Sequence, residues 1–181
     1  MLTRELYRWA SAEAVRYLEQ AGIVITQTEQ KCIEVAEYGL GMLDQVGLEL
    51  LVYVNTDRCC AKELVLFPGQ TCPEHRHPQI GDDIGKEETF RCRLGEVYLY
   101  VPGEASRQIK ARIPAGKEHV FTVRREVVLL PGEQFTLPPG SLHWFQAGPA
   151  GAVVSEFSTK SRDEFDVYTD PDIQAAAPRR V

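Results

Sequence analysis

The chain has 181 residues, of which 44% are hydrophobic and 25% are charged, a composition that predicts one globular domain over residues 1–181. Its formal net charge of −6 argues against nucleic acid and against a membrane surface as partners. No apolar run approaches the roughly 18 residues of a transmembrane helix, and residues 1–22 lack the apolar block of a secretory signal. Five cysteines in such a chain are typical of free thiols in a reducing compartment, so we expect a cytoplasmic protein.

Residues 1–32 predict a helical extension. Apolar residues recur at spacings of three and four between Thr3 and Ala21, which indicates an amphipathic helix, and Gly22 is a natural stop. The polar stretch Thr26–Lys31 predicts one short turn. The apolar positions of the helix are Leu6, Trp9, Ala10, Ala14, Tyr17, Leu18 and Ala21.

Residues 33–160 predict a β-barrel or sandwich, because many short runs of strand-forming residues are separated by Gly and Pro turns. Residues 161–181 predict a tail with a turn and one helical stub. The predicted strands are Leu48–Val54, Ala61–Phe67, Phe90–Arg93, Val97–Val101, His119–Val123, Glu126–Leu130 and Val153–Phe157.

Two of the four histidines form the segment His75-Arg76-His77. On a strand, residues two apart project from the same face, so both imidazoles could bind one ion. Taken alone, the pair is equally well explained as two surface histidines in a loop.

The surrounding glycines and prolines favour the metal interpretation. Gly69 precedes His75, and Gly95 follows Glu88. In the second half of the chain, a fixed order of turn residues leads to a histidine: Gly132, Pro138, Gly140 and His143. This arrangement resembles the paired motifs of the cupin superfamily, an all-β double-stranded β-helix, or jelly-roll barrel. The resemblance implies a metal bound by His75, His77, Glu88 and His143.

The acidic ligand has rivals in Glu74, Glu87 and Glu96, and Glu88 is preferred because only it leaves six residues before Gly95. Ten residues, 78–87, separate His77 from Glu88, more than in most cupins, and Ala147 stands where the second motif usually has Asn. Three imidazoles and a carboxylate leave two positions of an octahedron open for a substrate. The set suits Mn²⁺, Fe²⁺, Co²⁺, Ni²⁺ or Zn²⁺ without choosing among them.

Several longer segments resemble the D-lyxose isomerase family. They are Cys60-Ala61-Lys62-Glu63-Leu64-Val65-Leu66, Pro73-Glu74-His75-Arg76-His77-Pro78, Gly85-Lys86-Glu87-Glu88-Thr89-Phe90, Pro138-Pro139-Gly140-Ser141-Leu142-His143-Trp144-Phe145, Ser155-Glu156-Phe157-Ser158 and Thr169-Asp170-Pro171. In that family the long spacer before the glutamate is normal. The resemblance implies a manganese-dependent isomerase that interconverts D-lyxose and D-xylulose, and also D-mannose and D-fructose, and that forms a homodimer.

Such a reaction needs a carboxylate base, and Glu156 is the candidate because it interrupts the apolar run Val153–Phe157. A divalent ion that binds the carbonyl and its neighbouring hydroxyl would stabilise an enediolate. Lys62 shares strand parity with Leu64 and is the candidate that holds or protonates a sugar oxygen. Both residues could instead face solvent.

The remaining candidates would contact substrate. Asp83 and Lys86 belong to the polar insert 78–87, which is otherwise a solvated loop, and Trp144 could offer a flat wall to the sugar unless it packs in the core. Asp166 and Tyr168 are further candidates in the tail. His119 has no second histidine or acid nearby at the spacing of a metal site and is not expected to bind metal. Cys59 and Cys60 are predicted to be buried and to have no role beyond packing.

Two other classes of function stay open at this stage. The same ligands could hold a non-haem iron for oxygen chemistry, which predicts an apolar cavity and O₂ consumption. A cupin that only binds a sugar predicts tight binding without exchange of substrate hydrogen. The polar insert, Lys62 and Glu156 favour the isomerase.

Overall fold

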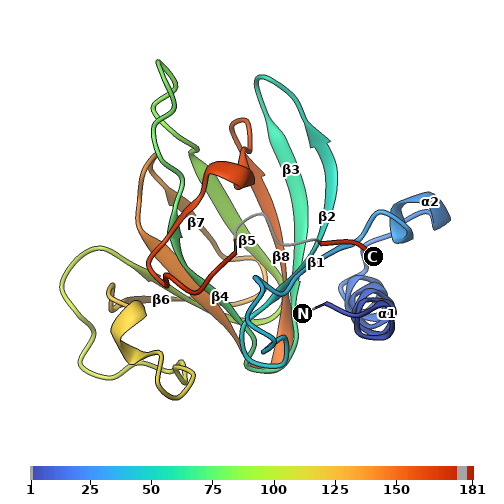
Figure 1. Ribbon diagram of the computed structural model, residues 1–181, viewed down its shortest axis with the longest axis horizontal. Helices are drawn as coiled ribbons and strands as arrows, with labels where there is room; N and C mark the ends of the chain where they lie inside the picture. The colour runs from blue at the N-terminus through green and yellow to red at the C-terminus, as the bar shows by residue number, and fades with distance from the viewer. Residues whose placement is uncertain (1, 175–178) are drawn as a thin grey trace.

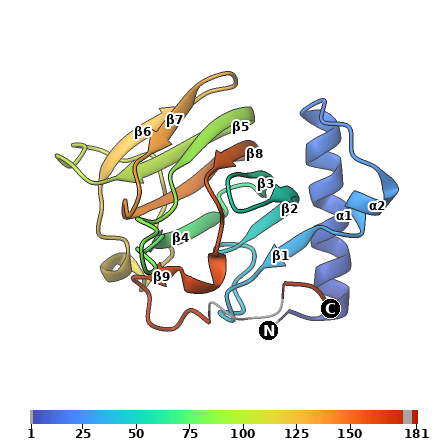
Figure 2. The same cartoon turned by 90° about the horizontal axis from the view of Figure 1, so that it is seen from above.

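The computed structural model describes residues 2–174 and 179–181. Helix α1 (Arg4–Gln20) begins at Thr3, whose side chain accepts a hydrogen bond from the Leu6 amide, and α2 (Gln27–Gln30) is a single turn. Both match the predicted N-terminal helix and turn. The apolar face of α1 buries Ala10, Ala14 and Leu18 against the outer side of the first strands (Figure 2). In the part of the chain that the structure describes, no helix combines the length and apolar character needed to cross a bilayer.

The rest of the chain is mainly β-structure, which confirms the predicted all-β class. A curled sheet forms an open barrel, with β1, β2 and β3 on the side next to α1 (Figure 1). The strands are β1 (Glu34–Ala36), β2 (Leu48–Asn55), β3 (Cys60–Leu66), β4 (Thr71–Arg76), β5 (Glu88–Val101), β6 (Arg125–Leu129), β7 (Gln134–Leu137), β8 (His143–Ser158) and β9 (Val167–Tyr168).

Two long antiparallel strands, β5 and β8, form the spine of the barrel. The second half of β8 pairs with β3 and its first half pairs with β4, while β5 pairs with β6 and β7. The predicted runs Phe90–Arg93 and Val97–Val101 are both parts of β5, and Val153–Phe157 lies within β8. These two strands were therefore located correctly but predicted too short, and β1, β4, β7 and β9 were not among the predicted strands.

The register of the β5–β8 pair shifts on both sides of Gly95. Gly95 has φ +74°, and an added Cβ would lie 2.0 Å from the Gly151 carbonyl oxygen. Only glycine allows this close approach of the two backbones, which lets both strands bend into the barrel. The glycine that the motif places after Glu88 therefore has a structural purpose.

Two sequence predictions are wrong here. Residues 119–123 are not a strand: Glu118–Val120 is a 3-10 helix, and the amides of Thr122 and Val123 donate to the Glu74 carboxylate instead of to a neighbouring strand. Cys60 is buried as expected, but Cys59 is exposed, because it lies in the turn before β3.

The C-terminal segment is more than a tail. A 3-10 helix (Asp163–Phe165) leads into β9, which pairs with β4 opposite His75 and Arg76. The segment crosses the open side of the barrel before the chain ends beside α1 (Figures 1 and 2). The predicted helical stub around residues 175–178 lies outside the described residues.

Candidate metal centre and cavity

Three imidazoles converge inside the barrel. His75 lies on β4, His77 follows that strand, and His143 begins β8 directly opposite His75, so the ligand nitrogens of all three lie within 4.8 Å of one another. Nδ1 of His75 lies 2.8 Å from the Pro73 carbonyl oxygen, and Nδ1 of His143 lies 3.0 Å from the Ser141 carbonyl oxygen. Because a carbonyl only accepts, each Nδ1 carries the proton and each Nε2 keeps a free lone pair.

Glu88 supplies the acidic group at this point. Its Oε1 lies 3.2 Å from His77 Nε2 and 3.1 Å from His143 Nε2. Burial by itself raises the pKa of Glu88, but the Lys86 ammonium and His77 outweigh it and hold this pKa well below its usual range. Burial lowers the pKa of His143, and although Glu88 opposes this effect, His77 adds to it, so this pKa stays below its ordinary value. The lone pair of the neutral His143 Nε2 therefore points at a carboxylate oxygen of Glu88, which also carries only lone pairs.

That arrangement is costly unless a cation lies between the two groups. Among the described residues, His143 Nε2 is one of the few buried polar side-chain atoms with no hydrogen-bond partner. Burial also lowers the pKa of His75 well below its usual value, so this ring too offers a neutral nitrogen. Burial lowers the pKa of His77, but Glu88 and Asp166 outweigh it and raise this pKa to about 9, so a metal ion would have to displace the proton of this ring. Three imidazoles and one carboxylate in a buried cluster are a ligand set that fits a divalent transition-metal ion.

The three rival carboxylates point elsewhere. Glu74 is buried but accepts hydrogen bonds from Thr122 and Thr169, which attach the neighbouring loops to β4. Glu87 is exposed, and the Glu96 carboxylate accepts from Tyr98 on the far side of the barrel. The spacing argument for Glu88 therefore selects the one acid of the four that lies beside the histidines.

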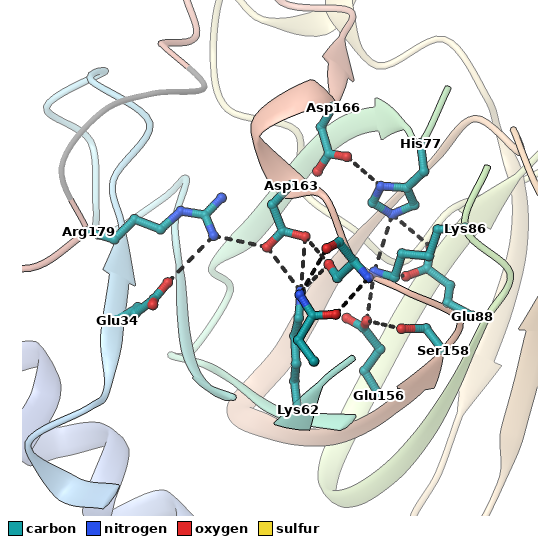
Figure 3. Close-up of polar contacts among 12 residues, drawn as sticks. Glu34, Lys62, His77, Lys86, Glu88, Glu156, Ser158, Asp163, Asp166 and Arg179 are labelled. Atoms are coloured by element: carbon teal, nitrogen blue, oxygen red, sulfur yellow. Dashed lines mark hydrogen bonds and ion pairs between the residues drawn. The ribbon is translucent and has the colours of Figure 1, made fainter. Parts of the chain in front are cut away.

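Lys86 and Glu156 form a buried ion pair next to these four groups. The Lys86 ammonium lies 2.6 Å from Glu156 Oε1, 2.8 Å from Glu88 Oε2 and 3.5 Å from His77 Nε2 (Figure 3). Ser158 donates a 3.1 Å hydrogen bond to Glu156 Oε1. Burial lowers the pKa of Lys86, but Glu156 and Glu88 raise it well above the ordinary value, so the lysine is charged. Glu156 lines the cavity, which is one of the two orientations that the sequence left open.

Lys62 also faces the cavity and is 4% exposed. Its ammonium donates 2.8 Å to Ser161 Oγ and 3.0 Å to both carboxylate oxygens of Asp163. Burial lowers the pKa of Lys62, but Glu156 and Asp163 outweigh it and raise it. A second cation therefore lies across from the Lys86–Glu156 pair.

The structure places two of the proposed substrate contacts in the cavity and a third outside it. Asp166 accepts a 2.5 Å hydrogen bond from His77 Nδ1 and lines the cavity, as does Tyr168, whose ring centroid lies 5.5 Å from that of His75. Asp83 lies outside the cavity, in an adjoining recess, and pairs with Arg162 at 3.2 Å.

The structure does not bring Trp144 to the cavity. Because His143 points inward, its neighbour on the strand points outward, where the indole stacks on Tyr100 with ring centroids 3.8 Å apart and donates to the Val123 carbonyl. Phe145, the next inward position, lines the cavity instead. His119, expected not to bind metal, lies in the 3-10 helix outside the histidine cluster.

Sequence reasoning missed three polar cavity residues, Tyr38, Asp163 and Arg179. Asp163 and Arg179 come from short irregular segments that show no periodicity. One signal was available for Asp163: a lysine that points into a barrel needs an anionic partner, and the tail after β8 is the nearest source of one.

A curled jelly-roll barrel with three histidines and a carboxylate inside is the architecture of a cupin metal site. A model of the D-lyxose isomerase family matches residues 6–177, and the chain therefore belongs to that family.

Relatives support this assignment. The chain is 60% identical over 174 residues to a D-lyxose ketol-isomerase from Thermofilum sp. (strain ex4484_79), covering 96% of this chain and 97% of that protein. It is 56% identical over 174 residues to a D-lyxose/D-mannose isomerase from Thermosediminibacter oceani, covering 96% of each. The L-ribose isomerase of Cellulomonas parahominis has the same fold, with a TM-score of 0.83, 17% identity and coverage of 99% of this chain and 97% of that one.

Proposed function

We propose that the protein is a metal-dependent aldose–ketose isomerase that interconverts D-lyxose and D-xylulose, and also D-mannose and D-fructose. The observation that carries the proposal is the cluster of metal-type ligands beside a buried Lys86–Glu156 pair in a member of this family. The relatives named above, at 60% and 56% identity, support the choice of sugars.

His75, His77, His143 and Glu88 would hold one divalent ion, which we propose to be Mn²⁺. When bound, the ion supplies Lewis acidity toward the oxygens on C1 and C2 of the sugar. The protein's part is to hold a proton on each Nδ1 and so direct each Nε2 at the ion. The Pro73 and Ser141 carbonyls do this for two of the rings, and the Asp166 carboxylate does it for His77.

Glu156 is the proposed base. Isomerisation removes the proton from C2 of the aldose and returns a proton to C1, while the hydroxyl proton on O2 moves to O1. A carboxylate that lines the cavity can take the proton from C2 and deliver it to C1. Ser158 and Lys86 hold Glu156 Oε1, which leaves Oε2 for the sugar.

Lys62 and Lys86 are proposed to bind sugar oxygens from opposite sides. Leu64, Phe90 and Phe145 line the same cavity and offer apolar surface to the sugar's C–H groups. They also exclude water from the proton transfer. Asp166 acts on the sugar indirectly, through His77.

The cavity must widen to admit a sugar. Its free volume is about 40 Å³, too small for a sugar, and Lys62 and Lys86 both line it. Lys86 contacts both Glu88 and Glu156, so a shift of its ammonium toward Glu156 alone would free a carboxylate oxygen and open space together.

The proposal is tested by stripping the protein with a chelator, adding Mn²⁺ and D-lyxose, and measuring D-xylulose by NMR. Turnover with Mn²⁺ and loss of turnover without it is the expected result. Glu156→Gln should keep the metal and lose turnover. Glu63→Gln is the matched control, since this carboxylate lies on the opposite face of β3 against Ser155 and should leave the rate unchanged.

Failure to form ketose from either D-lyxose or D-mannose would refute the isomerase. Oxygen consumption under the same conditions would indicate the oxygenase instead, and sugar binding without turnover would indicate a binding protein. Running the reaction in deuterated water tests the base: a proton carried by Glu156 exchanges with solvent, and a direct hydride shift does not.

We also propose that the protein is a cytoplasmic homodimer. Val54, Ala61 and Phe157 are neighbours across β2, β3 and β8, and the side chain of Phe157 is 50% exposed. Such an apolar strip suits contact with a second copy. Light scattering should give a dimer that Phe157→Glu weakens and Ile84→Glu, at another exposed apolar residue, does not. A monomeric wild-type protein would refute this.

A further inference from the structure

Three charged residues, Lys62, Asp163 and Arg179, form part of the cavity wall. The same residues line an outer groove of about 470 Å³ that opens toward solvent, so they separate the cavity from that groove. Arg179 lies beyond residue 177, where the match to the family model ends.

Asp163 is the centre of this wall. Its carboxylate accepts hydrogen bonds from Lys62 at 3.0 Å, from Arg179 Nη1 at 3.1 Å and from Ser161 Oγ (Figure 3). Burial raises the pKa of Asp163, but Lys62, Lys86 and Arg179 outweigh it and hold it well below the ordinary value. Asp163 is therefore an anion shared between two cations.

The backbone and side chain of Arg179 fix its place in the wall. Its carbonyl accepts a 2.8 Å hydrogen bond from the Val35 amide on β1, and Nη1 lies 3.7 Å from Glu34 Oε2. An arginine held in this way by its backbone carbonyl and by its guanidinium can orient a carboxylate with little loss of entropy.

The contact between Arg179 and Asp163 affects how many N–H groups of Lys62 remain for a ligand in the cavity. An ammonium has three N–H groups and no acceptor. One is directed to Ser161, and the Asp163 oxygens compete for the others. Both Asp163 oxygens lie 3.0 Å from Lys62 Nζ, so a single bifurcated N–H can serve this carboxylate. Arg179 also binds Oδ2 and so competes with Lys62 for this oxygen, which lets the third N–H of Lys62 point into the cavity.

We propose that Arg179 is a positioning residue: by sharing the Asp163 carboxylate, it keeps the Lys62 ammonium directed at a sugar oxygen. The inference rests on the isomerase function proposed above. Without Arg179, Asp163 draws Lys62 toward itself, and the sugar loses one charge-assisted hydrogen bond.

The experiment compares Mn²⁺-loaded Arg179→Ala, Arg179→Lys and Arg180→Ala with the wild type. Arg180 is the matched control, because it is the adjacent arginine and binds the same Glu34 at 2.8 Å, but it does not line the cavity. Arg179→Ala should raise KM for D-lyxose about tenfold, the cost of one hydrogen bond to a charged group, and leave kcat within about twofold. The metal content and melting temperature of Arg179→Ala should match those of the wild type. Arg179→Lys should bring KM back close to the wild-type value. Arg180→Ala should change neither KM nor kcat.

A double-mutant cycle tests whether the effect passes through the lysine. In a Lys62→Met background, Arg179→Ala should add no further rise in KM. An unchanged KM in Arg179→Ala, or the same tenfold rise in the Lys62→Met background, would overturn the proposal. A lower KM would also overturn it and would mark the Arg179–Asp163 pair as a barrier to sugar entry.

A wild-type protein without turnover would refute the proposed function. The role of Arg179 would then be tested by a crystal structure of Arg179→Ala, in which the position of the Lys62 ammonium is the readout. A Lys62 ammonium displaced from the cavity would support the positioning role, and an unmoved one would refute it.

Discussion

Asp166 offers a sharp test of how the protein prepares its metal ligands. The Oδ1–Nδ1 distance of 2.5 Å makes this the shortest contact on any of the three rings, and it fixes the tautomer that leaves His77 Nε2 free. The pairing of β9 with β4 at His75 and Arg76 holds Asp166 in place. Asp166→Asn replaces the anion with a neutral amide while keeping the shape of the side chain.

Loss of such a carboxylate behind a ligating histidine weakens metal binding by about 10- to 100-fold, or about 1.4–2.7 kcal/mol. The affinity for Mn²⁺ is measured by competition with a chromophoric chelator. Asp172→Asn, an exposed carboxylate in the same C-terminal segment, is the control and should bind Mn²⁺ as the wild type does. An affinity of Asp166→Asn within twofold of the wild type would refute the reasoning. Saturating Mn²⁺ should restore most of the activity, since Asp166 acts through His77.

Three further predictions concern stability. Lys86→Met leaves Glu88 and Glu156 buried without their shared cation, so chelator-treated protein should lose about 3–5 kcal/mol in urea unfolding, partly recovered with Mn²⁺; equal loss in both states would contradict this. Gly95→Ala should destabilise far more than Gly132→Ala, because a Cβ at Gly95 meets the Gly151 carbonyl oxygen at 2.0 Å, whereas Gly132 (φ +93°) has open space and should cost only about 1–2 kcal/mol; similar melting temperatures would contradict this. Burial raises the pKa of Glu49 well above its usual value, so the folded state holds this proton at pH values where the unfolded chain has released it, and stability falls as pH rises above the unfolded-state pKa. Glu49→Gln should therefore gain stability over the wild type as the pH of urea unfolding is raised from 5 to 8, and a constant difference would refute the assignment.

The sequence predicted the residues of the barrel interior because strands alternate. Lys62 was a candidate because it alternates in step with Leu64, and Glu156 because it interrupts an apolar run, and both line the cavity. Glu88 was selected by its distance from Gly95, and the close approach of Gly95 to Gly151 explains why that distance matters. The same alternation, applied to adjacent residues, would have excluded Trp144 from the cavity once His143 was placed inside.

The closing wall of the cavity could not be predicted in this way. Asp163 lies in a three-residue 3-10 helix and Tyr168 in a two-residue strand, which are too short to show a period. Asp83, in a loop with two glycines, turned out to pair with Arg162 in the neighbouring recess. Such positions depend on long-range ion pairs, which local sequence patterns do not encode.

Anomalous diffraction at the manganese edge, from crystals of Mn²⁺-loaded protein, tests the central claim most directly. The account predicts one strong peak bonded to Nε2 of His75, His77 and His143 and to the Glu88 carboxylate. A peak at other residues, or no peak at this cluster despite saturating Mn²⁺, would contradict it.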